Sequence, residues 1–157
     1  RGNWSEGLTT FMADHAYRED EGEDEAREMR LAWLRDFAAV RPELDQPLAR
    51  FVSRRHGAGQ AVGYNKAAFV FHMLRDLVGR SAFEAGLRDV WVRHRLQTAG
   101  WAELRAAFER ASGRDLGPFF AQWIDRPGAP SLRPSDAMTV GSIFRSAVQE
   151  RAPVCGR

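Results

Sequence analysis

A glutamate close to the beginning of the chain, Glu6, has a setting that suits two different roles. It stands in the stretch NWSEGL (residues 3–8), three positions after Asn3. A carboxylate can ligate zinc, but Asn followed three residues later by Glu also matches a capping box, in which Glu6 satisfies the first turn of a helix. These two residues alone favour the capping role, because one carboxylate without further ligands holds zinc poorly.

A tyrosine in the middle of the chain, Tyr64, could stabilise negative charge in a reaction. It lies in the stretch GYNKAA (63–68), which continues as FVFHMLR (69–75). A phenol stays protonated at neutral pH and can donate a hydrogen bond to an oxyanion that exists only in the transition state. A tyrosine at a helix start is also common as an amphipathic residue at the edge of a core. The 58 positions between Glu6 and Tyr64 are enough for a helix, a loop and a return to the same cleft.

The histidines do not form the motif that would complete a zinc site. Thermolysin-like peptidases hold zinc with two His and one Glu, and both His and the general base come from one HExxH helix turn. The four histidines begin the windows HAYRE, HGAGQ, HMLRD and HRLQT, none of which is HExxH. A zinc site that includes Glu6 would therefore need ligands from outside this sequence.

Taken together, three stretches resemble the M1, or gluzincin, family of zinc aminopeptidases. Residues 4–8 match the family's third metal-ligand helix, where Trp, a small polar residue, the ligand Glu, Gly and a hydrophobic residue follow one another. Residues 64–75 match a stretch with Tyr, a variable residue, Lys, two small residues and a helix ending in Met-Leu-Arg. FFAQW (119–123) and GAP (128–130) are similar to the closing helix and exit turn. The resemblance covers about residues 2–132.

This resemblance implies a role for Glu6 and one for Tyr64. Glu6 would be a zinc ligand, and Tyr64 would hydrogen-bond the oxyanion formed when zinc-bound water attacks a peptide carbonyl. Gly7 would let its helix pass close to the metal helix. Lys66, the one lysine of the chain, matches the lysine of that stretch, and its simpler explanation is that it braces the helix start or pairs with an acid. The family's Gly-x-Met-Glu-Asn stretch, which binds the substrate amino terminus, is absent, so aminopeptidase specificity follows by analogy alone.

Other candidate sites have simpler explanations. The glycine-rich stretch GAGQAVG (57–63) follows no expected strand and lacks Gly-Lys-Ser/Thr, so we interpret it as a flexible approach to Tyr64 rather than a phosphate loop. His15 and Glu19 are spaced as a possible metal-ligand pair, but a surface or half-buried histidine is commoner. His72 lies among apolar residues and is expected to be packed or hydrogen-bonded. Cys155 has no base partner that would activate its thiol.

Helical periodicity and capping signals predict a mostly α fold, a multi-helix bundle like the helical subdomain of a thermolysin-like metallopeptidase. The acidic run EDEGEDE (19–25) is expected to be a solvated loop and the start of the next helix. A capping box is expected at Ser81 and Glu84. The expected helices cover about residues 4–17, 26–41, 47–52, 64–78, 101–112 and 115–124. A further helix is expected to start at 81 and to include 87–91, and a weaker one is expected at 142–150.

Composition restricts the class of protein further. The chain has 157 residues, 44% of them hydrophobic and 28% charged, which is typical of a folded domain. We expect one domain at 1–132, and a linker or the start of a following domain at 133–157. The densest basic cluster is residues 54–56, too small for a nucleic-acid interface. No apolar run reaches the roughly 20 residues that span a membrane. A single cysteine leaves the compartment open.

The sequence therefore predicts a fragment of a zinc metallopeptidase that hydrolyses peptide bonds and removes amino-terminal residues. Its expected partners are a peptide substrate and the remainder of its own catalytic domain, with zinc in the full-length parent. The fragment alone is expected to bind no zinc and to be inactive. A non-catalytic helical interaction module related to the family is the alternative.

Overall fold

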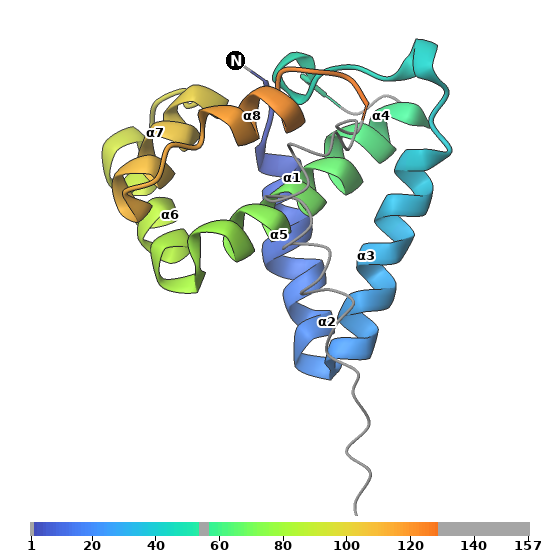
Figure 1. Cartoon of the computed structure of the whole chain (residues 1–157), viewed down its shortest axis with the longest axis horizontal. Coiled ribbons are helices and arrows are strands. Elements are labelled where there is room, and N and C mark those ends of the chain that lie inside the picture. Colours follow the sequence, from blue (N-terminus) through green and yellow to red (C-terminus); the bar gives the residue numbers. More distant parts are fainter. Residues whose placement is uncertain (1, 54–56, 129–157) are drawn as a thin grey trace, which may run out of the picture.

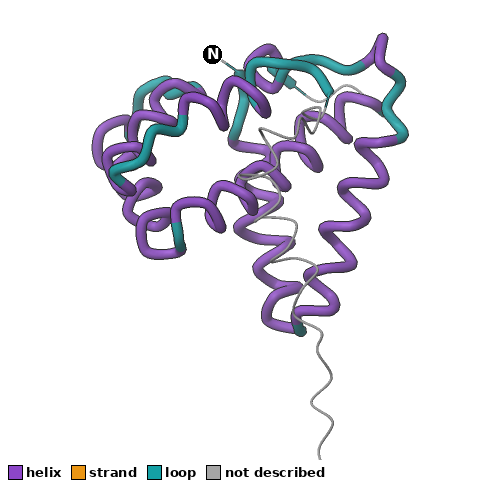
Figure 2. The backbone as a smooth tube through the Cα atoms, in the orientation of Figure 1, coloured by secondary structure: helices purple, strands orange, loops and turns teal. Residues whose placement is uncertain are grey.

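The structure is a computed structural model that describes residues 2–53 and 57–128. These residues form helices joined by short loops, with no β-strand among them (Figures 1 and 2). The predicted mostly α fold is therefore confirmed. No helix in this part of the chain combines the length and the apolarity needed to cross a bilayer. The predicted helix 142–150, Cys155 and the predicted second segment 133–157 lie outside the described residues.

The first helical rod runs along the middle of the molecule. It consists of α1 (Ser5–Thr9), the π-helix η1 (Thr10–His15) and α2 (Ala16–Glu21), which follow one another without a break. The rod lies beside α5 (Ala67–Val78), and α1 and η1 both contact it (Figure 1). The predicted helix 4–17 is present and extends four residues further.

The acidic run forms helix rather than loop. Only Gly22, with φ 151°, separates α2 from α3 (Glu23–Ala38), so most of the predicted loop belongs to these two helices. Glu23, Asp24 and Glu25 occupy the first turn of α3, where negative side chains stabilise the positive end of the helix dipole. α3 then packs along α2 and the segment before α5, and buries Ala26 and Trp33.

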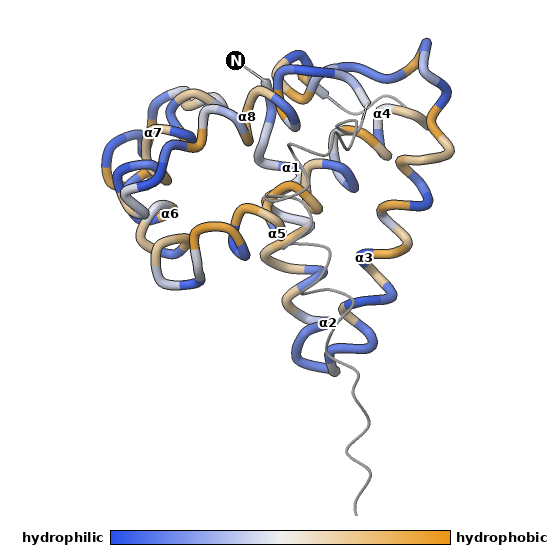
Figure 3. The backbone as a smooth tube through the Cα atoms, in the orientation of Figure 1, coloured by the Kyte–Doolittle hydropathy of each residue, from blue (hydrophilic) through white to orange (hydrophobic). Residues whose placement is uncertain are grey.

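Helix α5 is the centre of the core. It is apolar on most of its surface, because neighbouring helices cover it on several sides (Figure 3). Its buried side chains are Ala67, Ala68, Phe69, Val70, Phe71, Met73 and Leu74. Phe71 stacks on Trp101 at 5.5 Å between ring centroids, which joins α5 to the second half of the molecule.

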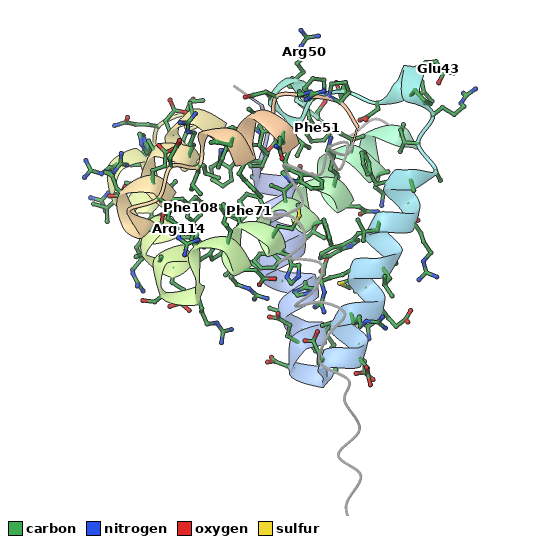
Figure 4. The ribbon with its side chains drawn as sticks, in the orientation of Figure 1. Glu43, Arg50, Phe51, Phe71, Phe108 and Arg114 are labelled. Carbon is green, nitrogen blue, oxygen red and sulfur yellow. The ribbon has the colours of Figure 1, made fainter. Side chains whose placement is uncertain are left out.

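The second half is a helical hairpin closed by a short helix. α6 (Arg80–His94) packs against α7 (Trp101–Ser112), and α8 (Gly117–Trp123) completes this side (Figure 1). Gly86 permits the close approach, because a Cβ there would lie 2.4 Å from Cδ1 of Phe108. In Figure 4, Phe71 and Phe108 lie inside the body, while Glu43 and Arg50 project outward.

Two predicted helix starts differ from the structure. The helix leading into α5 begins six residues early, as α4 (Ala58–Gln60) and the π-helix η4 (Ala61–Lys66), so most of the glycine-rich stretch is helical rather than a flexible approach. α6 begins at Arg80 after Gly79, without a side-chain cap, so the predicted capping box at Ser81 and Glu84 is wrong. The positive φ of Gly79, 85°, turns the chain between α5 and α6 instead.

The helices of the second half start and end close to their predicted positions, whereas the short helix predicted at 47–52 does not. α7 has the predicted bounds 101–112 and ends at Gly113 in the left-handed conformation, φ 67°. The carboxylate of Asp115 accepts the backbone N–H of Gly117 at 2.8 Å, at the start of α8. Residues 42–50 hold two short 3-10 helices, η2 (Pro42–Leu44) and η3 (Leu48–Arg50), where one short helix was predicted at 47–52.

Candidate functional site

Asn3 holds the start of α1 without using Glu6. Its Oδ1 accepts the backbone N–H of Ser5 at 3.0 Å and the Ser5 hydroxyl at 2.6 Å. Its own N–H donates to the carbonyl of Phe51 at 2.6 Å, not to the Glu6 carboxylate. The capping box that the sequence favoured for Asn3 and Glu6 is therefore not formed. The Glu6 side chain is half-buried on the first turn of α1 and has no capping role.

Two side chains attach this end of α1 to distant loops. The Trp4 indole N–H donates to the carbonyl of Ala99 at 2.8 Å, in the loop between α6 and α7. The Asn3 side-chain amide donates to the carbonyl of Val52 at 3.2 Å. The helix that carries Glu6 is thus fixed at its first turn by contacts on both sides.

Tyr64 lies inside the π-helix η4 and is half-buried. Its ring meets the ring of Phe51 edge-on, with centroids 6.4 Å apart and planes at 80°. Phe51 is fully buried, and a Cβ on Gly63 would lie 2.1 Å from its ring, so no side chain fits at that position. Short π-helical turns are rare and occur frequently at functional sites, because the extra residue redirects neighbouring side chains.

The segments that carry Glu6 and Tyr64 meet at one helix crossing. Gly7, which follows Glu6, packs on Ala67, one turn after Tyr64; a Cβ on Gly7 would lie 2.3 Å from the Cβ of Ala67. α1 also contacts η4 directly. Phe51 connects the two segments a second time, since its carbonyl accepts from Asn3 and its ring touches Tyr64. Two residues 58 positions apart thus flank the same junction.

Lys66 has a buried environment that the sequence did not define. It is 2% exposed, and its Nζ donates to the carbonyls of Gly128 at 3.0 Å and Arg126 at 3.5 Å. Burial lowers the pKa of its ammonium group, and the nearby carboxylate of Asp45 opposes that shift. A single lysine in an apolar helix was the only signal for this site, because its partner carbonyls lie 60 and 62 positions away.

A buried polar cluster connects three parts of the fold: the first helical rod, helix α3 and helix α5. His15 is fully buried, not half-buried as the sequence favoured. Arg30 donates to its Nε2 at 3.0 Å, and its Nδ1 lies 3.6 Å from the Glu19 carboxylate. The ring of His72 stands 5.5 Å from that of His15. Arg75 donates twice to Glu19, which ties α5 to α2.

The pKa values of both histidines in this cluster are lowered, so their imidazoles stay neutral until the pH is well below neutral. Burial lowers the pKa of His15 to about 4, with Arg30 and Arg75 acting in the same direction and Glu19 opposing. Burial and the same arginines lower the pKa of His72 to about 3. Hydrogen bonding from Arg75 lowers the pKa of Glu19, which stays ionised. The cluster is therefore a structural network of neutral imidazoles and ionised pairs near neutral pH.

The described residues do not complete a metal site. Nowhere in 2–53 and 57–128 are three or more His, Cys, Asp or Glu side chains grouped so that they could hold a metal ion. His15 and Glu19, the pair considered from the sequence, are already hydrogen-bonded to cations: Arg30 donates to Nε2 of His15, and Arg75 donates to the Glu19 carboxylate. Glu6 suits zinc chemically as one oxygen ligand. The other ligands would have to come from outside the described residues.

The chain belongs to peptidase family M1, because the model of the Peptidase family M1 domain matches residues 3–123. It is 29% identical over 154 residues to Aminopeptidase N of Streptomyces lividans, which covers 96% of this chain and 16% of the relative. Identity to Aminopeptidase N of Haemophilus influenzae is also 29%, over 94% of this chain and 17% of that protein. Leucyl aminopeptidase of Saccharolobus solfataricus is 28% identical over 60% of this chain and 12% of its own length.

These relatives are much longer than the chain. The sequence spans about a sixth of the first two, so it corresponds to a small part of each. No solved structure matches it significantly. The predicted membership of the M1 family is confirmed, and with it the class of the protein as a peptidase-family chain.

Proposed function

We propose that this chain forms the part of a zinc aminopeptidase catalytic domain that supplies one metal ligand and one transition-state donor. Glu6 is the ligand and Tyr64 is the donor. The observation that carries the proposal is the crossing of Gly7 on Ala67, which brings the segments of both residues to one junction. The π-helical setting of Tyr64 and the absence of a capping role for Glu6 support it further.

The carboxylate of Glu6 and the phenol of Tyr64 are chemically suited to the roles proposed for them. Bound zinc would supply a water made acidic enough to act as a nucleophile and would polarise the substrate carbonyl. Glu6 contributes a negative oxygen ligand from a helix that is fixed at its first turn. The Tyr64 phenol donates a hydrogen bond to the oxyanion that develops as the carbonyl is attacked. Phe51 limits the movement of the ring by its edge contact.

The substrate in this proposal is the amino-terminal end of a peptide. Relatives named Aminopeptidase N and Leucyl aminopeptidase support the removal of amino-terminal residues. The partner that completes the site is the remainder of the catalytic domain, which would contribute the HExxH helix and the pocket for the substrate amine. The isolated chain would therefore be inactive.

The experiment is a substitution of Glu6 in the intact protein. Glu6→Gln removes the negative charge with little change in shape, so we expect zinc content and aminopeptidase turnover to fall together. Glu28→Gln, on the exposed face of α3, is the matched control and should retain both. A Glu6→Gln protein with a full equivalent of zinc would overturn the ligand assignment. Absence of HExxH from the intact protein would instead favour a non-catalytic module.

A further inference from the structure

Lys66 is a buried cation placed two residues from the proposed transition-state donor. It is the one lysine in the sequence and shares the π-helix η4 with Tyr64. Lysine is rarely buried without partners, since the ammonium group loses its hydration. An apolar side chain would fill the same space at lower cost in desolvation. Its presence at this position therefore calls for a role that an apolar residue would not perform.

The contacts of Lys66 connect η4 to the turn that follows α8. Its Nζ donates to the carbonyls of Gly128 at 3.0 Å and Arg126 at 3.5 Å, and lies 4.8 Å from the centre of the Phe37 ring on α3. Hydrogen bonds to backbone carbonyls fix direction as well as distance. The ammonium group thus joins the end of η4 to two other parts of the fold.

That turn is itself attached to the segment that contacts Tyr64. The backbone N–H of Gly128 donates to the Asp45 carboxylate, and the N–H of Ala49 donates to the carbonyl of Ile124 at 3.0 Å. We call residues 45–51 the bracing loop. The ring of its last residue, Phe51, meets the Tyr64 ring edge-on, with centroids 6.4 Å apart. The bracing loop therefore touches Tyr64 at one end and the Lys66-bound turn at the other.

Because Tyr64 lies on a π-helical turn, the contacts around that turn help to set the direction of its side chain. The hydrogen bonds of a π-helix run from residue i to i+5 rather than to i+4, so side chains along it point in other directions than they would on an α-helix. Tyr64 and Lys66 lie on that same turn. Contacts at Phe51 and at Lys66 fix the turn on both sides of the donor. A displacement of about 1 Å at a reacting group can cost on the order of 10² in rate.

We infer that Lys66 is a positioning residue, which holds the Tyr64 hydroxyl in its productive direction by tying η4 to the Arg126–Gly128 carbonyls. The inference rests on the proposed function of Tyr64. Lys66 does not touch the reacting atoms in this scheme. It acts through the backbone of η4 and through the bracing loop.

A double-mutant cycle in the intact protein tests this role. Lys66→Met should retain zinc and change KM little, but lower kcat by about tenfold or more, because the donor is misdirected in the transition state. In a Tyr64→Phe background the same substitution should change kcat by less than about twofold, since no hydroxyl remains to position. An equal loss of kcat in both backgrounds, or no loss in either, would overturn the inference.

Two further variants keep the test decisive. Arg75→Met removes a half-buried cation that pairs with Glu19 from the next helix, so it should lower the melting temperature while its effect on kcat is the same with and without the Tyr64 hydroxyl. Should Lys66→Met fail to fold, Lys66→Gln repeats the cycle with a neutral side chain that can still donate to one carbonyl. The same coupling is expected, and its absence would refute the role.

The two proposals fail in different ways. Full turnover of the Tyr64→Phe single variant would overturn the proposed function of Tyr64. A slow Tyr64→Phe enzyme in which Lys66→Met acts independently would overturn the positioning role alone.

Discussion

Gly7 and Ala67 are packed so closely that a Cβ on Gly7 would lie 2.3 Å from the Cβ of Ala67. A side chain at position 7 would also lie 2.9 Å from the carbonyl carbon of Ala67. The helix backbone at Ala67 cannot move aside as the end of a flexible side chain can. The crossing of α1 on α5 therefore depends on glycine, and it sets the separation between the segments of Glu6 and Tyr64.

Gly7→Ala should separate these helices and destabilise the protein. Overpacking of a close contact typically costs about 1–3 kcal/mol. Urea unfolding measures the change, with Thr9→Ala on the exposed side of the same helix as the control, expected within about 0.5 kcal/mol of the unchanged protein. In the intact enzyme, turnover should fall as well. Equal stability of the Gly7→Ala and unchanged proteins would show that the crossing tolerates a wider separation.

Acid should destabilise the fold through His15 and His72. Their folded-state pKa values, about 4 and about 3, lie below the ordinary value of 6.5. The unfolded chain therefore takes up protons first as the pH falls below about 6.5, and stability decreases until the folded-state pKa values are reached. Each unit of pKa difference corresponds to about 1.4 kcal/mol. The loss between pH 7 and 5 should amount to a few kcal/mol.

Urea unfolding at several pH values checks this expectation. His72→Gln should make the decrease between pH 7 and 5 shallower, because one of the two titrating groups is gone. His94→Gln, at the end of α6 and away from the cluster, serves as the control. A pH dependence that His72→Gln leaves unchanged would mean that His72 does not carry this effect.

The isolated chain should bind no stoichiometric zinc. Glu6 supplies one ligand, and the described residues contain no group of three metal-binding side chains. Metal analysis after purification in metal-free buffer should find far less than one zinc per chain, and aminopeptidase turnover should be absent. One equivalent of zinc per chain would require a metal site that this account does not contain.

The local sequence was sufficient to predict the boundaries of helices that end at a strong stop residue such as glycine. α7 begins after Gly100, whose N–H donates to the Glu103 carboxylate at 2.7 Å, and ends at the left-handed Gly113. The start of the α4–η4–α5 rod was missed, because Gly59 and Gly63 weaken a helix in isolation. The Phe51 ring fills the space beside Gly63 and stabilises the helix there through tertiary packing. No local pattern reports that contact.

The candidate site likewise combines features that the local sequence predicts with features that only tertiary contacts determine. The residue types around Glu6 and Tyr64 pointed to the family, and the family is confirmed. Their setting depends on partners far along the chain: Phe51 for Asn3, and Gly128 for Lys66. His15 was expected at or near the surface, but groups from three helices enclose it. Such long-range pairings follow from the packing of helices and have no signature in residue spacing.

The central claim, that Tyr64 stabilises the transition state beside a zinc ion held in part by Glu6, is tested most directly by turnover of the Tyr64→Phe protein. The substitution removes one hydroxyl and leaves the ring contact with Phe51 in place. We predict full zinc content, an almost unchanged KM and a decrease in kcat of about 10² to 10³, the scale for losing one oxyanion donor. A Tyr64→Phe enzyme with undiminished kcat would contradict the account.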